Sequence, residues 1–196
     1  MNLDALQTFD KSILLAFNGG ENIFLDSFVL TLTSAYTWIP LYASLLYLVI
    51  KNNENWQKIM LIIGTVALGL FIVNGTNLGI VKPLIARARP LNSPDLQGIV
   101  VSVNHYVADG YSFFSSHTAN AFVLAVFFSL LVRDRIFSIL MIVWSIIVSL
   151  TRPYLGVHYP SDVLVGMIFG SSVAVLIYFL YLRMYIRFSD KLHYIS

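Results

Sequence analysis

The chain has 196 residues, of which 58% are hydrophobic and only 11% are charged. A soluble domain usually carries about 25% charged residues, so this composition excludes an ordinary soluble protein and predicts a single integral membrane domain over residues 1–196. The net charge of +2 gives no support for a nucleic-acid partner, and the absence of Cys excludes disulfides and thiolate metal sites.

Residues 1–26 carry an apolar stripe among several charged residues. The members of the stripe recur at steps of three and four positions: Leu3, Leu6, Phe9, Ile13 and Phe17. This spacing predicts an amphipathic helix that lies in the membrane interface and ends at Asn18-Gly19-Gly20. A helix that packs against the rest of the protein explains the same pattern equally well.

Uncharged runs suited to a membrane follow one another along the rest of the chain: residues 27–50, 59–81, 113–132, 136–150 and 163–182. A spanning helix needs about 20 apolar residues, and the shortest run can borrow flanking residues. We therefore expect an all-α polytopic helix bundle over residues 27–188, with five transmembrane helices plus the N-terminal interfacial helix. A sixth arises if Pro40 breaks the first run in two.

The cations between these runs predict the orientation of the bundle. One set falls on a single side, which the positive-inside rule assigns to the cytoplasm: Lys51, Lys58, Arg133, Arg135, Arg183, Arg187 and Lys191. The opposite side also carries cations: Lys11, Lys82, Arg87, Arg89 and Arg152. Most of this second set violates the usual bias, so we attribute it to the binding of phosphate.

Two other segments carry polar residues. Asn74, Thr76 and Asn77 lie inside the second run, where hydrogen bonds between helices are the expected role and the lining of a substrate slot is the alternative. Residues 90–112 form the one long connection, and their Pro, Gly, Asn and Asp content predicts an irregular segment on the outer side. Its length is typical of a loop that covers a substrate.

The densest polar cluster is TRPYLGVHYPSD, residues 151–162, which lies between two apolar runs. His158 can act as a nucleophile or base, and Asp162, four residues on, can fix the tautomer of its ring. Arg152 offers a planar fork suited to phosphate. Such groups at a membrane indicate a functional site, although a surface loop whose charges face water is the alternative.

Two further clusters belong to the same side of the membrane. Residues 82–90, KPLIARARP, supply Lys82, Arg87 and Arg89, and snorkelling at the membrane boundary is the alternative role for these cations. Residues 113–120, FFSSHTAN, place Ser115 at the expected N-cap of the third run and His117 in its first turn. The N-terminus of a helix presents free N–H groups to an anion.

Together the three clusters resemble the three-part signature of the type 2 phosphatidic acid phosphatase superfamily of membrane lipid phosphatases. The matching positions are Lys82, Arg89 and Pro90; Ser115 and His117; and Arg152, His158 and Asp162. The sequence departs from the usual pattern where Ser116 replaces a Gly and Thr151 replaces a Ser. A Cβ at position 116 narrows the phosphate pocket slightly, so substrate preference is the property we expect it to shift.

The resemblance implies a mechanism through a phosphohistidine. His158 would attack phosphorus, Asp162 would orient it, and His117 would protonate the leaving oxygen and then activate water. The phosphate would be held by a set of cations and hydroxyl-bearing residues: Lys82, Arg89, Arg152, Ser115 and Ser116. Arg87 is an accessory candidate. Three cations would supply the electrostatic stabilisation that Mg²⁺ often gives, so we expect no metal and no cofactor.

The resemblance also implies a class of substrate and a location. The expected partners are the lipid bilayer and a lipid phosphate: undecaprenyl diphosphate, phosphatidylglycerol phosphate, phosphatidic acid or a lipid A phosphate. The expected location is the inner membrane of a bacterium, with the active site facing the periplasm or the outside. Two alternatives are transfer of the phosphate to another acceptor and a non-catalytic binder or transporter of anionic lipids. The sequence gives no oligomeric state.

Overall fold

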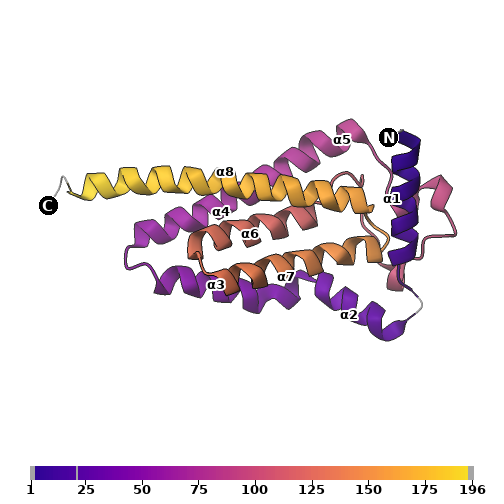
Figure 1. The fold of residues 1–196 in the computed structure, drawn as a ribbon, viewed down its shortest axis with the longest axis horizontal. Coiled ribbons are helices and arrows are strands. Elements are labelled where there is room, and N and C mark those ends of the chain that lie inside the picture. Colours follow the sequence, from indigo (N-terminus) through magenta and orange to yellow (C-terminus); the bar gives the residue numbers. More distant parts are fainter. Residues whose placement is uncertain (1–2, 21, 194–196) are drawn as a thin grey trace.

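The computed structural model describes residues 3–20 and 22–193, and within these ranges every regular element is a helix (Figure 1). The all-α prediction is therefore confirmed. The α-helices are α1 (Leu3–Phe17), α2 (Ile23–Thr33), α3 (Ile39–Lys51), α4 (Trp56–Thr76), α5 (Lys82–Ile85), α6 (Ser116–Val132), α7 (Arg135–Tyr154) and α8 (Pro160–His193). Residues 1–2, 21 and 194–196 of the predicted domain lie outside the described ranges.

The apolar helices identify an integral membrane protein. Three helical stretches of the described chain are long and apolar enough to cross a membrane: Trp56–Leu96, Arg135–Tyr154 and Pro160–Arg187. A fourth candidate is the pair formed by α2 and the segment Ala35–Lys51, and α6 is a shorter apolar helix. The prediction of five or six spans remains a prediction.

The first apolar run breaks earlier than its proline suggests. α2 ends at Thr33, a 3₁₀ turn covers Ala35–Trp38, and the two halves are bent by 63°. Trp38 Nε1 donates to the carbonyl of Leu32 over 2.7 Å, so a side chain serves one of the carbonyls that the end of α2 leaves free. Pro40 lies in the first turn of α3, where a missing N–H costs nothing.

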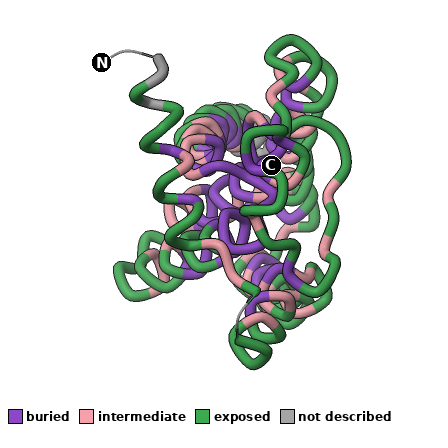
Figure 2. The backbone as a smooth tube through the Cα atoms, turned by 90° about the vertical axis from the view of Figure 1, so that its right-hand side faces the viewer, coloured by how far each residue is buried: buried purple, intermediate pink, exposed green. Residues whose placement is uncertain are grey.

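Helix α6 forms the centre of the bundle. It packs against α4, α7 and α8, and buried residues occur around its whole circumference, as expected for a helix without a polar face. Figure 2, seen from the end where α1 lies, shows the buried backbone gathered in the middle with exposed loops around it. Gly170 of α8 permits the closest approach, because a Cβ at that position would lie 2.2 Å from the carbonyl oxygen of Ala119.

The two ends of the bundle differ. The α3–α4 and α6–α7 connections, which carry the predicted cytoplasmic cations, lie at one end, and α1 crosses the other end at a steep angle to the bundle (Figure 1). α8 has 34 residues, about 51 Å at 1.5 Å per residue, and projects beyond its neighbours at the first end (Figure 1). The apolar stripe of α1 is exposed at Phe9, Ile13 and Phe17; its interfacial location remains a prediction.

The contact between α6 and α8 gives a test of the packing. We expect Gly170→Ala to destabilise the protein by about 1–3 kcal/mol, because the added methyl group has to push backbone atoms of α6 away. Gly64→Ala is the matched control, since nothing lies within 4 Å of its Cβ and alanine favours the helix of α4. Thermal unfolding in detergent measures both; equal melting temperatures for the two variants would contradict the packing described.

Candidate active site

The three sequence clusters meet at the end of the bundle where α1 lies. The first lies on α5 and the residues after it, the second at the start of α6, and the third joins α7 to α8. Five of their ionisable members are almost completely buried, with between 0% and 8% of each residue exposed: Asp162, His158, Arg89, Arg152 and Lys82. Charged residues are rarely buried unless they are paired, so this concentration indicates a functional site.

The α7–α8 connection places His158 and Asp162. Gly156 adopts a φ of +68°, which lets the chain turn sharply after α7. Pro160 then opens α8, as the sequence predicts, and Asp162 in the first turn accepts the backbone N–H of Tyr159 at 3.0 Å. This is the return half of a capping box, so the carboxylate that faces His158 is also fixed by the start of its own helix.

The ring of His158 lies between a carboxylate and a guanidinium. Its Nδ1 is 3.6 Å from Asp162 Oδ2, and its Nε2 is 3.2 Å from Arg89 Nη1. Arginine can only donate, so Nε2 has to accept, and the proton of the neutral ring therefore belongs on Nδ1, facing the carboxylate. Burial lowers the pKa of His158 from 6.5 to about 4, so Nε2 carries no proton at neutral pH.

Asp162 is held by donors that come from three separate parts of the chain. Its Oδ1 accepts from Arg87 Nη1 at 2.7 Å, while Oδ2 accepts from the hydroxyl of Ser112 and from the N–H of Tyr159. Arg87 is thus an ion-pair partner of the carboxylate. Sequence reasoning missed Ser112, which belongs to no motif; its place three residues before Ser115 is the only signal, and it is weak.

Arg89 forms hydrogen bonds that hold the long connection of residues 90–112 against the site. Its Nε and Nη2 donate to the carbonyls of Asp109 and Gly110 at 2.8–3.2 Å, and Nη1 donates to the carbonyl of Val157 at 2.8 Å. Residues 90–112 are therefore tied down beside His158 by a side chain of the site itself. These bonds account for the burial of a cation for which the family resemblance implies only a role in binding phosphate.

Arg152 keeps an unused donor inside the protein. Its Nη1 donates to Thr33 at 2.6 Å and to the hydroxyl of Tyr106 at 3.3 Å, whereas its buried Nε has no hydrogen-bond partner among the described residues. Thr33 ends α2, so the first apolar run also reaches the site. A buried N–H without a partner is costly and is available to a bound oxygen atom.

The start of α6 contributes as the sequence predicts. Ser115 is the N-cap, and its hydroxyl accepts the N–H of Thr118 at 3.3 Å. Asn77, in a π-helical turn (η2, Asn77–Val81) after α4, donates to the hydroxyl of Ser116 at 2.6 Å, which confirms the expected hydrogen bonding between helices. His117 follows, half-buried, and lies close enough to Arg152 and His158 to interact with their charges.

The charges of the site do not balance. Lys82, the first residue of α5, interacts electrostatically with Arg89, Arg152 and Asp162. The only carboxylate among these four is already paired with Arg87 at 2.7 Å. Three buried cations therefore form no salt bridge with a carboxylate of the described residues, so the arrangement favours an anion with several oxygen atoms, such as phosphate. Within the described residues, no group of three or more His, Cys, Asp or Glu side chains is placed to hold a metal ion.

Comparisons with known proteins agree with this chemistry. The model of the PAP2 superfamily matches residues 58–185. A lipid A 4'-phosphatase of Bacteroides thetaiotaomicron is 36% identical over 91% of this chain and 79% of its own length, and a lipid A 4'-phosphatase of Porphyromonas gingivalis is 29% identical over 88% and 73%.

A solved structure has the same fold. The crystal structure of a transmembrane PAP2 type phosphatidylglycerolphosphate phosphatase from Bacillus subtilis superposes with a TM-score of 0.66, covers 90% of this chain and 86% of its own, and is 22% identical. At that identity the likeness concerns the fold alone. The segment matched by the family model contains all three clusters of the site, and the Bacteroides enzyme is similar over most of its length. The chain therefore belongs to the PAP2 superfamily.

Proposed function

We propose that the protein is a metal-independent phosphatase that removes the 4'-phosphate of lipid A through a phosphohistidine. The observation that carries this proposal is the buried His158, 3.6 Å from Asp162 and 3.2 Å from the buried Arg89, at one end of a bundle of apolar helices long enough to span a membrane. The names of the two relatives support the 4'-phosphate of lipid A over the other three expected substrates.

The first chemical step breaks the bond between phosphorus and the lipid oxygen. Nε2 of His158 forms a new N–P bond, and His117 gives a proton to the leaving oxygen. Asp162 faces Nδ1 and stabilises the positive ring of the phosphohistidine. The equatorial oxygens are held by Lys82, Arg89 and Arg152, together with the N-terminus of α6 at Ser115 and Ser116.

The second step releases the phosphate. His117, now neutral, removes a proton from water, the water oxygen attacks phosphorus, and the N–P bond breaks, which restores His158. Water as the acceptor separates a phosphatase from a phosphotransferase that would use the same residues. The clusters of the site lie at the end of the bundle opposite the cationic connections (Figure 1). By the positive-inside rule, this arrangement supports a site that faces the periplasm from the inner membrane.

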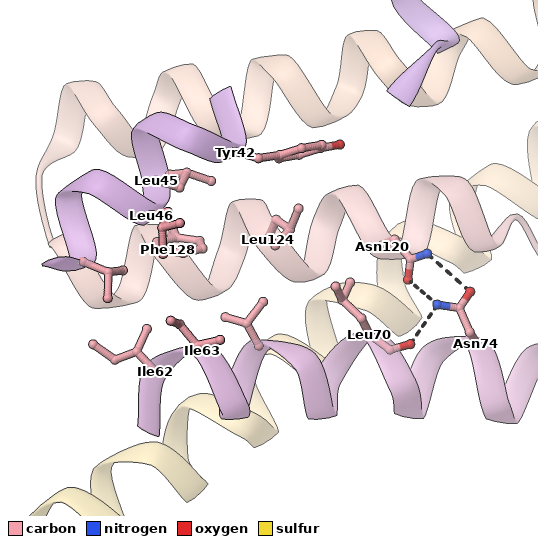
Figure 3. A pocket seen from close by; sticks show the side chains of 12 residues that line it. Tyr42, Leu45, Leu46, Ile62, Ile63, Leu70, Asn74, Asn120, Leu124 and Phe128 are labelled. Atoms are coloured by element: carbon pink, nitrogen blue, oxygen red, sulfur yellow. Dashed lines mark hydrogen bonds between the residues drawn. The ribbon is translucent and has the colours of Figure 1, made fainter. Parts of the chain in front are cut away.

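An apolar groove offers a place for an acyl chain of the lipid. It has a volume of about 440 Å³, lies between α3, α4 and α6, and is lined by residues such as Leu45, Ile63 and Leu124 (Figure 3). At one end of it, Asn74 and Asn120 exchange hydrogen bonds of 3.3 Å. These amides lie about one helical turn from Asn77 and His117, so the groove leads away from the site into the apolar part of the bundle.

Phosphate release from lipid A tests the function. We expect wild type to remove the 4'-phosphate in the presence of EDTA, and His158→Ala to lose activity by roughly 10³-fold or more because no other group can form the N–P bond. Mass spectrometry of the product identifies which phosphate is lost, with phosphatidylglycerol phosphate, phosphatidic acid and undecaprenyl diphosphate as comparison substrates. No phosphate from any of them, or inhibition by EDTA, would contradict the proposal.

The pKa of His158 has a spectroscopic consequence. In protein labelled with ¹⁵N-histidine, we expect one ring to keep a protonated Nδ1 and a bare Nε2 from pH 8 down to about pH 5 and to gain its second proton near pH 4, because burial disfavours the charged ring. The signal that disappears in His158→Ala identifies it. A ring that titrates near its ordinary value of 6.5 would show that His158 is open to water.

Filling the groove tests its role. We expect Leu124→Trp to raise the KM for lipid A about tenfold, equivalent to about 1.4 kcal/mol of lost binding, while hydrolysis of water-soluble p-nitrophenyl phosphate stays unchanged. Ile139→Trp, on an exposed part of α7 outside the groove, is the control for added bulk in the membrane region. If the two substitutions had equal effects on both substrates, the groove would not be part of the binding site for the lipid.

A further inference from the structure

One buried carboxylate of this region belongs to none of the three motifs. Asp10 lies on α1, whose described side chains are otherwise largely exposed, yet only 6% of Asp10 is exposed. Its Oδ1 accepts the N–H of Ser161 at 2.8 Å, and its Oδ2 accepts from the hydroxyl of Ser161 at 2.5 Å and from Arg87 at 2.6 Å. Both oxygens of this buried carboxylate therefore accept hydrogen bonds, and the bonds fix its position.

Arg87 joins this carboxylate to the one beside His158. Its Nη2 lies 2.6 Å from Asp10 and its Nη1 lies 2.7 Å from Asp162, while its guanidinium stacks over the ring of Tyr159 at 3.7 Å. Both terminal nitrogens are therefore engaged by carboxylates, and the stacking fixes the plane of the fork. Because its terminal nitrogens are paired with Asp10 and Asp162, Arg87 is not free to act as a phosphate ligand.

The second carboxylate changes the charge that His158 experiences. Arg87 with Asp162 alone forms a neutral pair, which would do little to stabilise a positive imidazole ring. With Asp10 added, the three groups carry a net charge of −1, and Oδ1 of Asp162 is fixed so that Oδ2 remains directed at His158. Outer groups that orient a reacting side chain in this way commonly change activity 10- to 100-fold.

We infer that Asp10 is a positioning residue, which acts through Arg87 on Asp162, so that α1 belongs to the catalytic apparatus. The inference rests on the phosphatase function proposed above. The competing explanation is that Asp10 only attaches α1 to the bundle. Asn18 offers a control for attachment. It forms hydrogen bonds of 2.7–3.1 Å with Tyr154 and Val101 and, among the described residues, none with Asp10, Arg87 or Asp162.

The experiment compares Asp10→Asn with Asn18→Ala on lipid A micelles, measuring kcat, KM and the melting temperature. Asp10→Asn keeps the size of the side chain and removes its charge, so we expect kcat to fall at least about tenfold with KM changed less than twofold. Asp10→Glu restores the charge and should recover part of kcat. Asn18→Ala should lower the melting temperature and leave kcat unchanged.

Arg87→Lys provides a second, independent measurement should Asp10→Asn fail to fold. A lysine keeps the charge and loses the fork, so kcat should fall while KM for lipid A remains within twofold; a phosphate ligand would instead raise KM, as we expect for Lys82→Met. If Asp10→Asn keeps the kcat of wild type, or if Arg87→Lys raises KM, the inference about Asp10 is wrong while the proposed function still stands. A wild type without activity on any lipid phosphate overturns the proposed function and the inference with it.

Discussion

The carboxylate of Asp162 is the group on which the rest of the site depends. It is completely buried, and an uncompensated charge in such a place would cost several kcal/mol. Its donors come from the segment after α5, from the connection before α6 and from the start of α8. Segments more than 70 residues apart in the sequence, from Arg87 to Asp162, are thus brought to one point because a single buried charge needs all of them.

The cations at the end of the bundle that carries the site fall into two groups, which differ in whether a carboxylate neutralises them. Arg87 is neutralised by carboxylates, whereas Lys82, Arg89 and Arg152 form no salt bridge in the part of the chain that the structure describes. Arg89 and Arg152 are held instead by carbonyl and hydroxyl oxygens, which orient a guanidinium without cancelling its charge. On the proposed function, positive potential is therefore preserved where the phosphate would lie, and this would explain why cations occur on the side where the positive-inside rule expects few of them.

The sequence was sufficient for features that depend on local patterns. Runs without charge, the N-cap at Ser115 and the proline at the start of α8 are properties of neighbouring residues. Proline is the strongest local signal for a break, so the sequence predicts a kink or break at Pro40, whereas side chains of the turn between α2 and α3 stabilise the actual break after Thr33. Ser112 and Asp10 could not be assigned, because a hydroxyl or carboxylate becomes significant only through a partner distant in the chain.

Helix α6 connects the chemistry to the membrane. His117, Asn120, Leu124 and Phe128 recur at steps of three and four residues, so they share one face of the helix. The last three line the apolar groove, and the first lies close enough to His158 to interact with its charge. On the proposed function, a lipid that lies along this face has its phosphate near His117 and an acyl chain beside Leu124. One rigid helix would then fix the distance between head group and chain, which gives a physical reason for the proposed proton donor to lie on the central helix that also lines the groove.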